Sequence, residues 1–154
     1  MNIPALGATA PDFTLSCTAG STVTLSSFRG TTPVLLAFFP LAFTSTCTTE
    51  VCAFSDDYAQ FETLGVMVLP ISVDSVQTLR EFKAKYAITV DMASDFKRDA
   101  SRAYGVLNAD KFYSNRAYFL VDRAGMLRWS HVESANSERR DTAELIAAIA
   151  PHTG

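Results

Sequence analysis

The chain has 154 residues, of which 48% are hydrophobic and 19% are charged, and its formal net charge is -3. These values are typical of one folded domain, expected over residues 1–154, and they exclude a disordered chain. Because no cluster of Lys and Arg is available to neutralise phosphates, nucleic acid is not an expected partner.

The amino-terminal part predicts a β-hairpin followed by a central strand. Residues 12–16 and 22–25 are joined across Ala19-Gly20, and glycine supplies the positive φ that such turns need. The run Val34 to Phe39 is apolar throughout and is bounded by two prolines. This pattern is typical of a strand buried on both faces of a parallel sheet, so the hairpin is an extension that precedes it.

A helix and a second strand are predicted next. The i, i+3, i+7 spacing predicts one helix over residues 44–64, with a buried stripe made up of Val51, Phe54, Tyr58 and Phe61. Gly65 ends it, and residues 66–73 read as another buried strand. The three elements make a right-handed βαβ unit. Pro70 argues against central pairing of the second strand, because proline has no N–H to donate.

The second half of the chain predicts three more helices and a hairpin. Asp74, with Gln77 three residues later, marks the start of a helix whose buried face holds Leu79, Phe82 and Tyr86. A short helix closes at Tyr104-Gly105. Residues 117–121 and 126–132 flank a turn and form two antiparallel strands. The last helix covers residues 138–150 and ends before Pro151.

This order of elements predicts an α/β fold. A central mixed β-sheet is flanked by helices and carries an N-terminal β-hairpin extension, which is the layout of a thioredoxin-like fold. The fold alone does not decide the chemistry.

Cysteine usage directs attention to thiol chemistry. Three cysteines are too few for a disulfide scaffold, and an odd number leaves at least one thiol free. Neither His131 nor His152 lies near a cysteine in the sequence, so the spacing of a zinc site is missing. We therefore expect no metal and no cofactor.

We also expect a cytoplasmic location and no membrane partner. The apolar run 34–39 is far shorter than the roughly twenty residues of a spanning helix. Residues 1–13 lack the basic start and long apolar run of a secretory signal.

Cys47 is the candidate nucleophile. It lies in the first turn of the helix after the first central strand, where open α/β sheets place their ligand crevices. The free N–H groups and partial positive charge of a helix start stabilise a thiolate, which is the nucleophilic form. As a lone residue, however, Cys47 also fits the apolar stripe of its helix, and a buried structural cysteine would then be favoured.

The neighbours of Cys47 decide between these interpretations. The segment Pro40-Leu-Ala-Phe-Thr44-Ser-Thr-Cys47 resembles the peroxiredoxin signature Pro-x-x-x-Thr/Ser-x-x-Cys. The resemblance implies that Cys47 attacks a hydroperoxide and that Pro40 shields its thiolate from water. The Thr44 hydroxyl would bind one peroxide oxygen, while backbone N–H groups near Thr46 and Cys47 hold the other. Alternatively, Thr44 is a helix N-cap and nothing more.

The same family has an arginine late in the chain, and the segment Asn115 to Asp122 resembles the one that carries it. Arg116 is thus the candidate that stabilises the thiolate and the leaving oxygen, because a guanidinium stays charged. Taken alone, Arg116 would be interpreted as a surface ion pair. Glu50 either orients Arg116 through a carboxylate fork or serves only the helix dipole.

The resemblance extends over most of the chain. Further matching segments are Ala10 to Phe13, Phe38 to Pro40, Ser72 to Asp74, Ser94-Asp95, Tyr104 to Val106 and Arg116 to Gly125. The chain departs from the family at Val90-Asp91, where relatives usually carry Phe-Pro, and this leaves the shape of the loop open.

Cys52 is the candidate resolving cysteine. Its five-residue distance from Cys47 resembles the PrxQ group, or bacterioferritin comigratory proteins, whereas residues 38–44 and Asn115-Arg116 resemble the AhpE group. Five helical steps place Cys52 about 140° round from Cys47 and off the apolar stripe, so core packing is not expected to explain it. The two Cα atoms would lie about 8–9 Å apart, so a disulfide requires the first turns to unwind.

The resulting hypothesis is a thiol-dependent peroxidase. Peroxide oxidises Cys47 to sulfenic acid, Cys52 condenses with it, and a thioredoxin-like or glutaredoxin-like dithiol restores both thiols. The alternatives are a one-cysteine peroxidase without Cys52, a peroxide sensor, or a redox-regulated binding protein.

Two further features stay open. Cys17 on the first hairpin is expected to be an apolar filler, with a role as an alternative resolving thiol as the other option. Phe43 and Phe112-Tyr113 fit either a homodimer surface or core packing.

Overall fold

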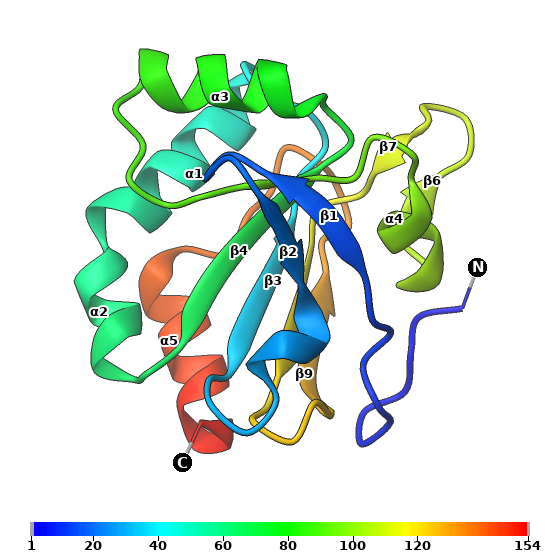
Figure 1. Ribbon diagram of the computed structural model, residues 1–154, viewed down its shortest axis with the longest axis vertical. Helices are drawn as coiled ribbons and strands as arrows, with labels where there is room; N and C mark the ends of the chain where they lie inside the picture. Colours follow the sequence, from blue (N-terminus) through cyan, green and yellow to red (C-terminus); the bar gives the residue numbers. More distant parts are fainter. Residues whose placement is uncertain (1, 154) are drawn as a thin grey trace.

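The computed structural model describes residues 2–153 and contains a seven-stranded sheet of order β2-β1-β5-β4-β3-β8-β9 (Figure 1). Its strands are β1 (Thr14–Cys17), β2 (Thr22–Thr24), β3 (Val34–Phe38), β4 (Met67–Ser72), β5 (Ala93–Ser94), β8 (Ala117–Val121) and β9 (Leu127–Val132). A separate two-stranded sheet pairs β6 (Leu107–Asn108) with β7 (Tyr113–Ser114).

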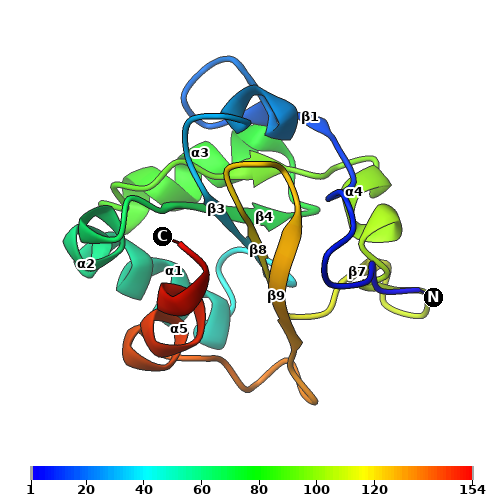
Figure 2. The same cartoon turned by 90° about the horizontal axis from the view of Figure 1, so that it is seen from below.

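Helices cover both faces of the large sheet, as Figure 2 shows. They are α1 (Ser45–Asp56), α2 (Tyr58–Thr63), α3 (Val76–Lys85), α4 (Asp99–Ala103) and α5 (Thr142–Ile149), with 3-10 turns at Leu25–Phe28 and Ala150–His152. Helices α1, α2, α3 and α5 share one core cluster with the sheet, whereas α4 and the amino-terminal segment pack into a second cluster. The expected α/β, thioredoxin-like class with an amino-terminal hairpin is confirmed.

Strand β3 is the central strand that the sequence predicted. All five of its residues are buried, and it pairs parallel with β4 and antiparallel with β8. Alternation along the strand sends Leu35 and Ala37 into one core cluster and Leu36 and Phe38 into the other. The strand therefore ends at Phe38, two residues before Pro40, between two covered faces.

Pro70 is tolerated in β4 because its nitrogen faces a gap in the sheet. Ile71 accepts a hydrogen bond from Phe39 beside the end of β3, and successive residues of a strand turn their backbone groups to opposite sides. The nitrogen of Pro70 thus faces β5. Strand β5 pairs only with Ile71 and Ser72, so within residues 2–153 no strand residue lies opposite Pro70 on that side.

The single helix predicted over residues 44–64 is wrong in one respect, because it is two helices that meet at Asp57. Asp57 has φ −99° and ψ 12°, which is outside the helical region. Its carboxylate accepts a hydrogen bond from Thr142, at the start of α5. This contact with a distant helix anchors the break, and it cannot be read from the local periodicity.

Two predicted helix starts are also corrected. Helix α3 is capped by Ser75, whose side chain accepts from the Thr78 N–H, whereas Asp74 accepts from Ser72 and from the Ala42 N–H instead. Helix α5 begins at Thr142, not at residue 138, because Asp141 and Glu144 form a capping box there. The predicted buried Tyr86 lies beyond the end of α3 and is 38% exposed.

The loop that departs from the family pattern has its own network. Asp91 accepts hydrogen bonds from Thr18 at 2.9 Å and from Lys83 at 2.5 Å, and it thereby ties the first hairpin to α3. Partial burial acts to raise the pKa of Asp91, but the bonds from Lys83 and Thr18 outweigh it and lower the pKa below 3.8. The short strand β5, which the sequence did not predict, follows this loop.

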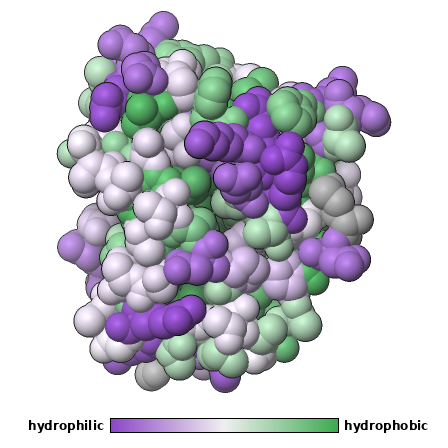
Figure 3. Space-filling model, turned by 45° about the vertical axis from the view of Figure 1, so that its right-hand side comes forward, coloured by the Kyte–Doolittle hydropathy of each residue, from purple (hydrophilic) through white to green (hydrophobic). Residues whose placement is uncertain are grey.

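None of the helices within residues 2–153 has the length and apolar character that crossing a bilayer requires. On the side that carries α4, hydrophobic residues lie in separate groups between hydrophilic ones (Figure 3).

Candidate active site

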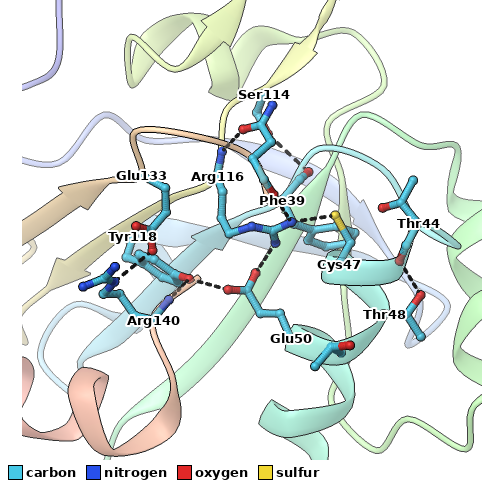
Figure 4. Close-up of polar contacts among 12 residues, drawn as sticks. Phe39, Thr44, Cys47, Thr48, Glu50, Ser114, Arg116, Tyr118, Glu133 and Arg140 are labelled. Carbon is cyan, nitrogen blue, oxygen red and sulfur yellow. Dashed lines mark hydrogen bonds and ion pairs between the residues drawn. The ribbon is translucent and has the colours of Figure 1, made fainter. Parts of the chain in front are cut away.

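Cys47 lies in the first turn of α1, directly beyond the carboxyl end of β3, and is 2% exposed. Cys47 lines a pocket of about 160 Å³. Figure 4 shows its sulfur beside the guanidinium of Arg116. The pocket is lined by Pro40, Leu41, Thr44, Ser45, Thr46, Cys47, Tyr113, Arg116 and Asn136. The crossing from β3 into α1 thus brings Pro40, Thr44 and Cys47 to one opening, together with an arginine from far along the chain.

Arg116 directly precedes β8. Its side chain is completely buried, so any ion pair that it forms is not on the surface. Its Nη2 donates to the Sγ atom of Cys47 at 3.0 Å, and its Nη1 donates to Oε1 of Glu50 at 2.6 Å. Burial alone would lower the pKa of Arg116, but the charges of Glu50 and of the Cys47 sulfur outweigh it and raise that pKa. The guanidinium is therefore charged and directed at the sulfur.

Glu50 contacts Arg116 through one oxygen only, not through the two-oxygen fork that was proposed. Its second oxygen, Oε2, accepts a hydrogen bond from the Tyr118 hydroxyl. Burial raises the pKa of Glu50, while the charge of Arg116 and the bond from Tyr118 act against that rise. The side chain is fully buried, so the helix dipole alone does not account for its position.

Thr44 occupies the N-cap position of α1, but its side chain makes no capping bond. Its hydroxyl instead donates to the Leu41 carbonyl at 2.7 Å. As a result, the N–H groups of Thr46 and Cys47 have no hydrogen-bond partner within the described chain. Unpaired amides at a helix start are suited to hold an anion or a polarised oxygen.

Two residues of the site were missed by sequence reasoning. The side-chain oxygen Oδ1 of Asn136 accepts a hydrogen bond from the backbone N–H of Arg116 at 3.1 Å. The backbone carbonyl of Asn136 accepts a second one from Arg116 Nη2, also at 3.1 Å. Asn136 lies in an irregular loop without a motif, so no sequence signal marks it. Tyr118 does have a weak signal, because a tyrosine inside an apolar strand needs a partner for its hydroxyl.

The other two cysteines, Cys52 and Cys17, lie in different parts of the fold. Cys52 is partly buried and packs against the core cluster of α1, which corrects the expectation that core packing would not explain it. Burial, and secondarily the charge of Asp56, raise the pKa of Cys52 above its ordinary value of 9.0. Cys17 is 6% exposed at the end of β1, with β5 and β4 between β1 and β3 in the sheet.

No group of three or more His, Cys, Asp or Glu within residues 2–153 is arranged to hold a metal ion.

Known proteins are similar to this chain in sequence and in fold. The AhpC/TSA family model matches residues 6–130. Alkyl hydroperoxide reductase E of Mycobacterium tuberculosis is 39% identical over 148 residues, which cover 94% of this chain and 97% of that protein. A putative peroxiredoxin of Synechocystis is 37% identical over 156 residues, covering 94% of this chain and 78% of that protein.

Solved structures agree. The reduced 2-Cys peroxiredoxin of Plasmodium vivax superposes with a TM-score of 0.85 at 31% identity, covering 94% of this chain and 93% of that one. AhpC of Mycobacterium tuberculosis superposes with a TM-score of 0.86 at 26% identity, covering 96% and 92%. These matches confirm the resemblance inferred from the motif around Cys47.

Proposed function

Because the chain belongs to the AhpC/TSA family of peroxiredoxins, and so is a thiol peroxidase, we propose that Cys47 is the sulfur that attacks the hydroperoxide. The observation that carries the proposal is the 3.0 Å contact between its Sγ and the buried guanidinium of Arg116. A lone structural cysteine would have no need of such a partner, because a neutral thiol is readily buried without one.

In the proposed first step, the Cys47 thiolate attacks the terminal oxygen of the hydroperoxide. The O–O bond breaks, the hydroxyl group goes to sulfur to give a sulfenic acid, and the remaining alkoxide takes a proton from water to leave as an alcohol. Arg116 lines the pocket, and beyond its bonds to Cys47, Glu50 and Asn136 it has two N–H groups without a partner, one on Nη1 and one on the buried Nε. The unpaired Nη1–H, with the positive charge of the guanidinium at the pocket, supports a role in stabilising charge on the breaking O–O bond.

The remaining pocket residues receive roles that follow from their positions. The Thr44 hydroxyl donates its hydrogen to the Leu41 carbonyl, so its oxygen lone pairs are left to accept a hydrogen bond. We expect the peroxide O–H to be the donor of that bond. The unpaired N–H groups of Thr46 and Cys47 would hold the other oxygen. Pro40 lines the same pocket as Cys47 and brings no polar N–H, so it would help to exclude water.

We assign the second step to Cys52. Its thiolate attacks the sulfenic sulfur of Cys47, the S–O bond breaks, and the hydroxide that leaves takes up a proton to form water. Cys52 lies on the same helix as Cys47, and the amino end of that helix bears no side-chain cap that would resist unwinding. A thioredoxin-like or glutaredoxin-like dithiol would then reduce the disulfide through a mixed disulfide.

The exposed aromatics near the pocket support a second copy of the chain as a partner. Phe43 is 44% exposed and Phe112 is 48% exposed, and both have positive φ, at 68° and 60°. Sedimentation of the protein and of Phe112→Ser tests this homodimer, since a dimer through this surface would dissociate more readily in the variant.

Hydroperoxide consumption by Cys47→Ser, with a thioredoxin system as reductant, tests the proposed function. The variant is expected to lose activity, and turnover at the level of the unaltered protein would overturn the proposal. A peroxide sensor would differ from an enzyme in the same assay, because it would be oxidised once and recycle slowly.

A further inference from the structure

Tyr118 connects the helix that carries both Cys47 and Cys52 to the rest of the site. We propose that Tyr118 is a positioning residue of the peroxidase reaction. Through Glu50, its hydroxyl keeps Cys47 against Arg116 and opposes the unwinding that brings Cys47 to Cys52. This inference rests on the proposed resolution by Cys52.

The contacts around Glu50 come from three separate parts of the fold (Figure 4). Glu50 belongs to α1, Tyr118 lies in β8, and Arg140 lies in the loop before α5. The Tyr118 hydroxyl donates to Oε2 of Glu50 and accepts from the Arg140 N–H at 2.9 Å. With Arg116 on Oε1, both oxygens of the buried carboxylate are paired.

The direction of the Tyr118 bond is fixed by its surroundings. Burial and the charge of Glu50 raise the pKa of Tyr118 above its ordinary value, so the phenol stays protonated and remains the donor. A carboxylate without exposure to water depends on such donors, because water cannot replace them. Glu50 in turn holds Nη1 of Arg116, so that Nη2 stays directed at Cys47.

Disulfide formation requires this arrangement to open. Glu50 lies between Cys47 and Cys52, and the two sulfurs meet only if that stretch of helix unwinds. Beyond Cys52, Ser55 bonds to Thr89 at 2.8 Å and Asp57 bonds to Thr142, so the end of α1 is anchored. The turn that contains Glu50 must therefore be the part that unwinds. Tyr118 opposes this unwinding through its hydrogen bond to Glu50.

Tyr118 also has a purely structural role that must be separated from this one. Its ring stacks on Trp129 and on His131, with centroids 6.4 Å apart in each pair. Tyr118→Phe keeps the ring and removes only the hydroxyl. Tyr104→Phe is the matched control, because Tyr104 is equally buried, donates its hydroxyl to the Pro11 carbonyl at 2.7 Å and packs in the other core cluster.

The experiment is rapid quenching with thiol alkylation and mass spectrometry after one equivalent of hydrogen peroxide. The reduced protein, Tyr118→Phe and Tyr104→Phe are compared, with circular dichroism to show that each is folded. In Tyr118→Phe, oxidation of Cys47 should slow and formation of the Cys47–Cys52 disulfide should accelerate, each by about tenfold to a hundredfold, as loss of one bond to a buried charged group implies. In Tyr104→Phe both rates should stay within about twofold of the unaltered protein.

Opposite changes in the two rates are the signature of positioning. If Tyr118→Phe leaves both rates unchanged, or changes both in the same direction, the inference is overturned while the proposed function stands. If the unaltered protein forms no Cys47–Cys52 disulfide, the resolving role of Cys52 and this inference fail together.

Discussion

The Nη2 atom of Arg116 lies 3.0 Å from the sulfur of Cys47, although 69 positions separate the two residues in the sequence. The positive charge of Arg116 is already balanced by Glu50, which is also buried. A thiolate at Cys47 would therefore be stabilised by directed N–H donors and by the start of α1 rather than by an excess of positive charge. The position of each donor consequently matters more than the total charge of the site.

Arg116→Lys tests this dependence on geometry. Lysine keeps the charge but has a single nitrogen, so it does not reproduce the arrangement in which Nη1 bonds Glu50 while Nη2 bonds Cys47 and Asn136. The rate constant of Cys47 oxidation by hydrogen peroxide, measured by stopped flow, should fall by about a hundredfold, as for the loss of a preorganised donor. A loss of less than about threefold would mean that charge alone is sufficient.

Cys52→Ser tests the resolving cysteine. After one equivalent of peroxide, the variant should accumulate Cys47 sulfenic acid and contain no intramolecular disulfide at Cys47, because Cys17 lies on β1, with two strands between it and β3. Trapping with dimedone followed by peptide mapping measures both species. Cys17→Ser is the control and should form the same disulfide as the unaltered protein; a disulfide between Cys17 and Cys47 would contradict the assignment.

The pH dependence of disulfide formation follows from the raised pKa of Cys52. Only the thiolate attacks, and below the pKa the thiolate fraction rises about tenfold for each pH unit. Because burial and Asp56 raise this pKa above 9.0, the rate should keep increasing from neutral pH to about pH 8.5. Quenched-flow measurements at several pH values check it, and a rate independent of pH would contradict attack by Cys52.

Asp91→Asn tests the network that replaces the usual loop sequence. The pKa of Asp91 is lowered in the folded state, so its stabilisation is present above its ordinary value of 3.8 and is lost as the pH falls below that value. The variant should lose about 0.5–1 kcal/mol at pH 7, because the pair with Lys83 is partly exposed. At pH 3 the difference should be small.

Urea unfolding of Asp91→Asn at both pH values measures this effect. Asp99→Asn is a suitable control, since the Asp99 side chain is 76% exposed and lies 3.9 Å from Arg102. An unchanged loss of stability at pH 3 would show that the Asp91 carboxylate acts through something other than its charge.

Much of the fold and part of the candidate site were predictable because their signals are local. The apolar run of β3, the turn between β8 and β9 and the spacing Pro40, Thr44, Cys47 each extend over a few residues. Such signals are recorded in the chain itself, since side-chain period and turn chemistry depend on near neighbours. Arg116 was found in the same way, by the motif at the start of β8.

The sequence by itself therefore determined the class of the fold and the family, and it named Cys47 as the candidate nucleophile. The tertiary structure alone decided that Asp57 breaks the helix, that Tyr118 takes one oxygen of Glu50, and that Asn136 holds Arg116. These contacts join residues from different elements, and they depend on strand register, on the face to which each side chain points and on where each helix lies against the sheet. A pattern along the chain specifies the local structure around each residue. The hydrogen-bond partners of a buried polar group, in contrast, are fixed only when separate elements pack together.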